Sequence, residues 1–102
     1  MDKLVLAGQE FDSRLIVGTG KYASGAVLAE SIKASGAQIA TMAVKRVDVQ
    51  HNTDDIIKPL RELGITLMPN TSGARNAAEA VFAANLAREA LGTDWIKVEV
   101  HP

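Results

Sequence analysis

The sequence contains no cysteine, which excludes disulfide bonds, thiolate metal sites and a cysteine nucleophile in these 102 residues. Histidine is scarce, and the two present, His51 and His101, provide little for a metal site or a Ser-His triad. Aromatic residues make up only 4% of the chain, too few to predict a base-stacking platform. The formal net charge is -1, whereas a nucleic-acid binder needs a basic surplus to meet phosphates. We therefore expect no metal site and no nucleic-acid partner.

Long apolar runs are absent as well. No stretch approaches the ~20 apolar residues of a membrane span, and no basic-then-apolar leader for export begins the chain. We therefore expect a cytoplasmic protein with no membrane partner. The length allows a single domain, because domains cluster at roughly 100–150 residues.

Short apolar runs of β character alternate with longer segments of helical spacing. This alternation predicts βαβ units and a parallel sheet. The expected strands are Arg14–Val17, Ile39–Val44, Ile65–Met68 and Trp95–Val100.

Helix start and stop signals lie between these runs. They predict helices from Ser24 to Gly36, from Thr53 to Gly64 and from Asn76 to Gly92. Segments Lys3–Ala7 and Gln9–Asp12, on either side of Gly8, predict a small N-terminal hairpin or cap.

The chain stops at Pro102, with no helix after the fourth expected strand. Natural folds seldom leave a parallel edge strand exposed in this way. We therefore expect residues 1–102 to be one partial domain, truncated after the fourth strand. A compact four-stranded flavodoxin-like domain or a swapped dimer is the alternative.

The turn after the first strand is a candidate binding site. Gly18, Gly20 and Ala23 fit the pattern G-x-G-x-x-A, and Lys45 and Arg46 follow the second strand where a nicotinamide-binding domain would place an acidic residue. Because basic residues replace the acidic one, this interpretation leaves only a small NADP- or phosphate-binding α/β module. A tight strand-to-helix turn explains the glycines equally well.

The polar run that follows the third strand is a second candidate. Pro69 is expected to stop strand pairing, and Asn70 and Thr71 can direct side chains and backbone N–H groups at a substrate. The same residues also suit a loop built from Asx and Ser turns.

The fourth expected strand carries the most informative pattern. By alternation, Ile96, Val98 and Val100 share the face that packs on helices, so Lys97 and Glu99 face the interior of the sheet. Lysine and glutamate are almost never fully buried unless paired, and burial favours the neutral amine that can form an imine. A carboxylate beside it could move protons. The alternative is an edge strand whose polar face meets water.

Four ordered motifs of the chain together resemble thiazole synthase of thiamine biosynthesis. The resemblance covers nearly all of these residues but only the N-terminal part of that family's barrel. The motifs are Phe11–Tyr22, Lys45-Arg46, Leu67–Ala74 with Ala78–Val81, and Ile96–Val100.

The resemblance implies the N-terminal part of a (β/α)₈ TIM barrel, here about four parallel strands and three helices. Lys97 corresponds to the lysine that forms an imine (Schiff base) with 1-deoxy-D-xylulose 5-phosphate, and Glu99 to a glutamate that serves acid/base steps. Dehydroglycine and the thiocarboxylate of a sulfur-carrier protein supply the remaining atoms of thiazole phosphate, with no metal or other cofactor. A cytoplasmic homo-oligomer is implied for the full-length transferase.

The later strands of that barrel are absent from the sequence. They carry a further catalytic acid and the phosphate-binding loops, which such barrels place after strands 7 and 8. We therefore expect the chain alone to be inactive. A non-catalytic piece that assembles with the missing part is a third possibility.

Overall fold

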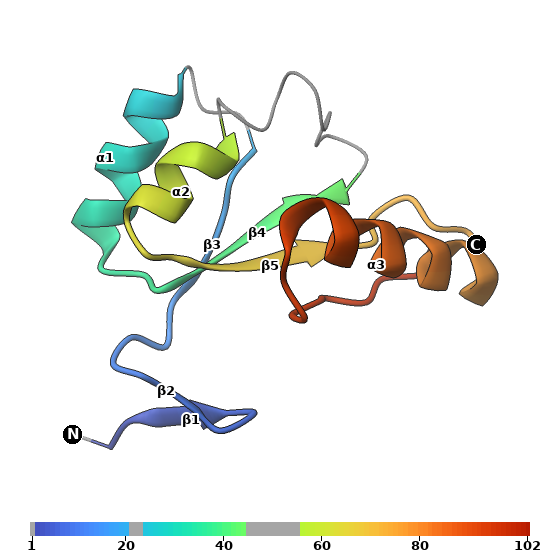
Figure 1. Ribbon diagram of the computed structural model, residues 1–102, viewed down its shortest axis with the longest axis horizontal. Coiled ribbons are helices and arrows are strands. Elements are labelled where there is room, and N and C mark those ends of the chain that lie inside the picture. The colour runs from blue at the N-terminus through green and yellow to red at the C-terminus, as the bar shows by residue number, and fades with distance from the viewer. Residues whose placement is uncertain (1, 21–23, 45–55) are drawn as a thin grey trace.

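The computed structural model describes residues 2–20, 24–44 and 56–102. It is an α/β structure with a three-stranded parallel sheet, three helices and a separate two-stranded hairpin (Figure 1). The parallel strands are β3 (Ile16–Gly18), β4 (Ile39–Ala43) and β5 (Thr66–Asn70). The helices are α1 (Gly25–Ser35), α2 (Lys58–Glu62) and α3 (Ala77–Leu91).

The strands lie in the order β3-β4-β5, so each pairs with the next along the chain. A flavodoxin-like order would instead place the first parallel strand between the second and the third. The observed order and the intervening helices match the N-terminal part of a (β/α)₈ barrel, as predicted.

Local capping signals set the ends of α1 and α3 where the sequence predicted them. The Ser24 side chain accepts the Val27 N–H at the start of α1, which ends at Gly36 in the left-handed conformation. Asn76 accepts the Glu79 N–H at the start of α3, and Gly92 ends that helix. The expected start of the second helix at Thr53 lies outside the described residues, and α2 ends at Glu62, just before Gly64.

The core lies between one face of the sheet and the helices. Alternate strand residues, such as Ala40, Met42 and Leu67, pack against Leu28 and Leu60 of α1 and α2. Leu91 at the end of α3 joins the same cluster, and its carbonyl accepts a 2.8 Å hydrogen bond from the Arg61 guanidinium of α2.

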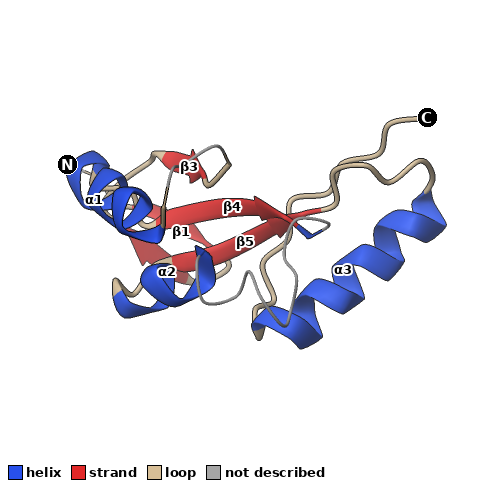
Figure 2. Cartoon of the chain, turned by 90° about the horizontal axis from the view of Figure 1, so that it is seen from above, coloured by secondary structure: helices blue, strands red, loops and turns tan. Residues whose placement is uncertain are grey.

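The helices do not cover the sheet evenly. Helices α1 and α2 lie side by side over it, whereas α3 extends beyond the ends of β4 and β5 (Figure 2). As a result, Val81, Phe82 and Leu86 of α3 are exposed. No helix in the described part of the chain has the length and apolar character needed to cross a membrane.

The predicted hairpin is confirmed. Strands β1 (Leu4–Leu6) and β2 (Gln9–Phe11) pair antiparallel around Ala7 and Gly8, both of which have positive φ. Glycine tolerates this conformation, and two such residues give the turn whose twist matches a two-residue hairpin. The hairpin lies at the end of the sheet where β4 and β5 begin (Figure 1).

Side-chain hydrogen bonds fix the hairpin and the connection after it to this end of the sheet. The Gln38 side-chain oxygen accepts the backbone N–H groups of Asp12 and Ser13. Gln9 donates to the hydroxyl of Thr66, the first residue of β5.

The fourth expected strand, Trp95–Val100, is reduced to a single parallel bridge between Asn70 and Lys97. The predicted element is therefore present only at one residue. The chain that leaves β5 turns away after Thr71, into a loop in which Gly73 has a φ of 93°. The prediction that Pro69 stops pairing was also wrong, because β5 continues to Asn70 and the Pro69 carbonyl accepts the Lys97 N–H at 2.8 Å.

Candidate functional site

The candidate site is built on segment 97–101, which runs beside the residues that follow β5. Lys97 is held on both sides of its Cα, since its N–H donates to the Pro69 carbonyl and its own carbonyl accepts the Thr71 N–H at 3.2 Å. The bridge places Lys97 level with Asn70, the last residue of β5. Active sites of α/β barrels form at this carboxyl end of the strands.

Strand register determines the face on which Lys97 lies. Asn70 pairs with Ala43, while the neighbouring pair, Pro69 and Met42, occupies the opposite face. Met42 belongs to the core cluster under the helices. Because side chains alternate along a strand, Asn70 and Lys97 share the face turned away from the helices. In a closed barrel this is the interior face, as the sequence predicted for Lys97.

Thr71 holds Glu99, the next residue on this face after Lys97, by hydrogen bonds. It is only 2% exposed, and its hydroxyl both accepts the Glu99 N–H and donates to the Glu99 carbonyl, at 2.7 Å each. Both hydrogen-bonding functions are therefore engaged with the backbone that carries the candidate acid. Thr71, which was predicted to bind substrate, thus holds the backbone of Glu99 in this structure.

Lys97 and Glu99 come together in an ion pair. The Lys97 Nζ lies 3.4 Å from the Glu99 Oε1, closer than backbone spacing alone guaranteed. The Glu99 side chain is 23% exposed and that of Lys97 54% exposed. The described residues therefore do not bury Lys97, and the burial expected for it is not present in this structure.

Asn70, the other predicted substrate-binding residue, ends β5 beside Lys97. Its side-chain oxygen accepts the Ser72 N–H at 3.1 Å and closes an Asx turn. Its amide nitrogen has no hydrogen-bond partner among the described residues. Asn70 therefore keeps a donor on the face that also carries Lys97.

The face that carries Lys97 is apolar toward the N-terminal hairpin. Trp95, two residues before Lys97, meets Phe11 of β2 edge to face, with ring centroids 5.7 Å apart. The hairpin thus covers this face at Trp95, on the side away from Lys97 and Glu99. The expected packing of Val98 and Val100 on helices is not found, because both side chains are exposed.

The glycine turn after β3 is only partly described. Thr19 is buried and its hydroxyl donates to the Thr41 carbonyl, which ties the turn to β4. The other residues of this candidate site, Lys21 to Ala23, Lys45 and Arg46, lie outside the described residues, as does His51. The NADP- or phosphate-binding alternative gains no support from the part that is described.

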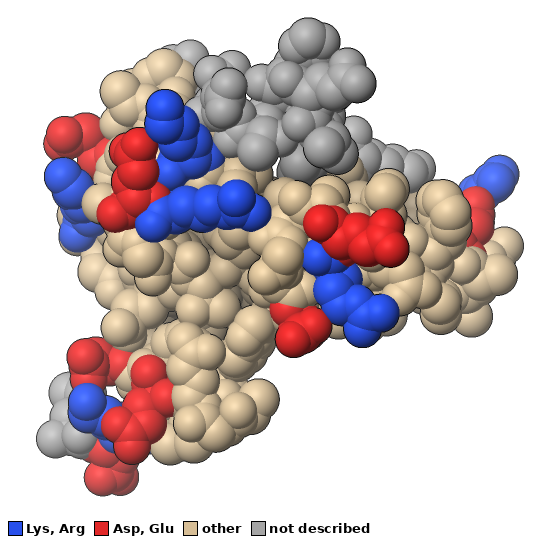
Figure 3. All heavy atoms as spheres, viewed as in Figure 1, with Lys and Arg blue, Asp and Glu red and all other residues tan. Residues whose placement is uncertain are grey.

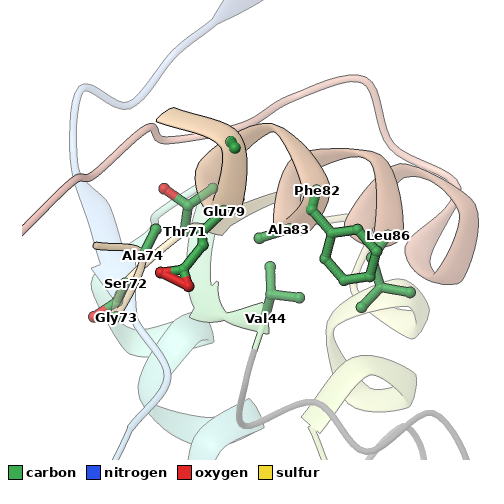
Figure 4. A pocket seen from close by; sticks show the side chains of 10 residues that line it. Val44, Thr71, Ser72, Gly73, Ala74, Glu79, Phe82, Ala83 and Leu86 are labelled. Carbon is green, nitrogen blue, oxygen red and sulfur yellow. The ribbon is translucent and has the colours of Figure 1, made fainter. Parts of the chain in front are cut away.

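An open hollow of about 410 Å³ lies between α3 and the end of β4. Its lining is mostly apolar, with Phe82 and Leu86 of α3 facing Val44, and Glu79 near the start of the helix (Figure 4). Neither Lys97 nor Glu99 is among its lining residues. Thr71, whose hydroxyl holds the Glu99 backbone, does line it, so the hollow adjoins the candidate site on the side of α3.

Basic and acidic side chains lie interspersed on the face drawn in Figure 3. Among the described residues, the Arg75 guanidinium pairs with the Glu79 carboxylate at 2.9 Å. That hydrogen bond, and then the attraction between the charges, raise the pKa of Arg75 above its ordinary value. Within residues 2–20, 24–44 and 56–102, no three His, Asp or Glu side chains are grouped to hold a metal ion.

Comparison with known proteins decides the family. A profile of the family described as "Thiazole biosynthesis protein ThiG" matches residues 5–102. The chain belongs to this family.

Curated relatives of the ThiG family agree. Proteins named thiazole synthase from Shewanella sp. (strain ANA-3), Photobacterium profundum and Vibrio campbellii are 59%, 60% and 59% identical to the chain over 99 residues. Each match covers 97% of this chain but 39% of the relative. The chain thus spans about two fifths of the length of the curated relatives it matches.

One residue of the site, His101, was not predicted from the sequence. His101 lies two residues beyond Glu99, and its Nε2 is 3.3 Å from the Glu99 Oε2. The spacing 97, 99, 101 could have placed all three side chains on one face.

Proposed function

We propose that the protein provides the imine-forming part of a thiazole synthase. The reaction condenses 1-deoxy-D-xylulose 5-phosphate with dehydroglycine and with sulfur from the thiocarboxylate of a sulfur-carrier protein. It takes place in the cytoplasm, in a homo-oligomer whose barrel contains residues 1–102 as its N-terminal part. Membership of the ThiG family and the names of the relatives support this assignment.

The observation that carries the proposal is the contact between Lys97 and Glu99. An amine and a carboxylate lie 3.4 Å apart, level with the end of β5 and on the face away from the helices. Imine formation needs a nucleophilic amine and a nearby group that moves protons. This pair brings both groups to one ketone.

The two residues have distinct roles in the step. A proton first passes from the Lys97 ammonium to the Glu99 carboxylate within the pair. The neutral Nζ then attacks the ketone carbon, and the carbonyl oxygen takes up the proton that the nitrogen loses and becomes the hydroxyl of a carbinolamine. Protonated Glu99 then gives its proton to that hydroxyl, which leaves as water while the nitrogen lone pair forms the C=N bond. The Glu99 carboxylate next accepts the proton from the carbon beside the imine, which starts the tautomerisation.

Asn70 and Thr71 support the same site. The amide nitrogen of Asn70 can donate to a substrate oxygen, because it lies beside Lys97 at the end of β5. Thr71 acts through Glu99, since its hydroxyl is engaged with the Glu99 backbone.

Borohydride trapping tests the assignment of Lys97. The protein as its gene encodes it is incubated with 1-deoxy-D-xylulose 5-phosphate, reduced and mapped by peptide mass spectrometry. We expect the reduced adduct on Lys97 and none in Lys97→Ala. Lys3→Ala is the matched control, because Lys3 is also 54% exposed and pairs with a carboxylate, Asp12, at 3.2 Å in the distant hairpin. An adduct on Lys21 or Lys45, with Lys97→Ala still labelled, contradicts the proposal.

Glu99→Gln tests the proton-transfer role. Glutamine keeps the shape of the side chain but cannot exchange a proton at neutral pH, so imine formation should slow by about 10²–10⁴-fold. The rate of adduct formation in quenched time courses measures this effect. An unchanged rate would assign proton transfer to another group.

A further inference from the structure

The Glu99 carboxylate has a different partner on each of its oxygens. Oε1 faces the Lys97 Nζ at 3.4 Å, and Oε2 faces the His101 Nε2 at 3.3 Å. Among the described residues, these are the two charged or titratable groups in contact with it. Lys97 is the nucleophile of the proposed reaction, whereas no role has been given to His101.

The backbone holds His101 beside Glu99. The His101 N–H donates to the Ala74 carbonyl at 2.8 Å, and the Ala74 N–H donates to the Thr71 carbonyl at 3.0 Å. Thr71 in turn holds the backbone of Glu99. The His101 ring is 69% exposed, yet its Cα belongs to the same hydrogen-bonded framework as the carboxylate that it contacts.

We propose that His101 is a positioning residue for Glu99 in the reaction proposed above, on which this inference rests. Its Nε2–H donates to Oε2, and this hydrogen bond keeps Oε1 turned toward the Lys97 amine. A glutamate side chain rotates about three bonds, so a contact with Lys97 alone leaves the second oxygen unrestrained. His101 touches the carboxylate and not the reacting atoms.

The geometry explains why this restraint affects the rate of the reaction. The proton of Glu99 must reach a hydroxyl that forms directly at the Lys97 Nζ. A group held in a productive orientation avoids the loss of freedom that the transition state would otherwise require. Second contacts that orient a functional side chain act in this way.

Two variants of His101 separate a hydrogen bond from a merely structural contribution. His101→Ala removes the donor. His101→Gln retains an N–H donor on a side chain of similar reach. Both are made in the protein as its gene encodes it, because the reaction needs the complete site.

The first measurement is the rate of borohydride-trapped imine formation with 1-deoxy-D-xylulose 5-phosphate. We expect His101→Ala to slow the reaction by about 10- to 100-fold. His101→Gln should restore most of the rate, and substrate affinity should be unchanged in both variants. An unchanged rate in His101→Ala, or equal losses in the two variants, would overturn the proposal.

The second measurement needs no substrate. Three-bond couplings in NMR spectra report the rotamers of the Glu99 side chain. We expect one dominant rotamer in the unmodified protein, averaging in His101→Ala and recovery in His101→Gln. The same rotamer distribution in all three would overturn the role of His101. If no variant forms an adduct, the proposed function fails, and the couplings still decide whether His101 positions Glu99.

Discussion

At the scale of single residues, Thr71 shows how a side chain can replace a strand partner. The backbone of β5 ends at Asn70, so it cannot continue the ladder to Glu99. The Thr71 hydroxyl supplies both missing functions, since it accepts the Glu99 N–H and donates to the Glu99 carbonyl. Segment 97–101 therefore stays beside β5 beyond the single backbone bridge.

We predict that Thr71→Val destabilises the protein by about 1–3 kcal/mol. Valine fills nearly the same volume, but it leaves the Glu99 N–H and carbonyl without their partner. Chemical denaturation of the two proteins measures the difference. Thr71→Ser is the control, because serine keeps the hydroxyl and should lose less; equal losses in the two variants would show that the hydroxyl is not the stabilising group.

At the scale of secondary-structure elements, α3 owes its ends to local capping signals. Asn76 accepts the Glu79 N–H at 2.9 Å, and Gly92 in the left-handed conformation closes the last turn. Much of this helix extends beyond the sheet (Figure 2), and Val81, Phe82 and Leu86 in it are exposed. The caps therefore contribute a larger share of its stability than they do for α1, which packs into the core.

We predict that Asn76→Ala lowers the free energy of unfolding by about 0.5–2 kcal/mol. The substitution removes the acceptor for one N–H group of the first turn. Asn85→Ala is the matched control, since Asn85 is exposed in the middle of α3 and alanine favours a helix interior. Urea denaturation compares the variants, and an equal loss in both would contradict the capping argument.

At the scale of the whole molecule, two apolar surfaces lie open. One is formed by Val81, Phe82 and Leu86 of α3, and the other by Val98 and Val100. The edges of β3 and of segment 97–101 also have no further strand beside them in the described part of the chain. Open edges and exposed apolar side chains favour association between chains.

We predict that the isolated 102-residue chain associates or unfolds at low denaturant concentration. Small-angle scattering should then give a radius of gyration above the 13.7 Å of the structure. A cooperatively unfolding monomer near that radius would contradict the prediction. A dilution series separates association from unfolding, because only association depends on concentration.

The sequence by itself was sufficient to predict the features that depend on local interactions. Ser24 with Gly36 and Asn76 with Gly92 mark helix ends, because a cap needs only its neighbours along the chain. Regular alternation of strands and helices predicted a parallel sheet, and its order β3-β4-β5 followed from the even spacing together with the resemblance to a barrel family. Ordered motifs were enough to indicate the family.

Only the tertiary structure decided how the candidate site is held together. Alternation predicted the face of Lys97 and Glu99, but their ion pair and the exposure of Lys97 depend on which surfaces pack around them. The contact of His101 with Glu99 and the support from Thr71 join residues from two separate stretches of the chain. Such contacts arise from the path of segment 97–101 beside β5, which no local pattern encodes because its partner lies more than 25 residues away.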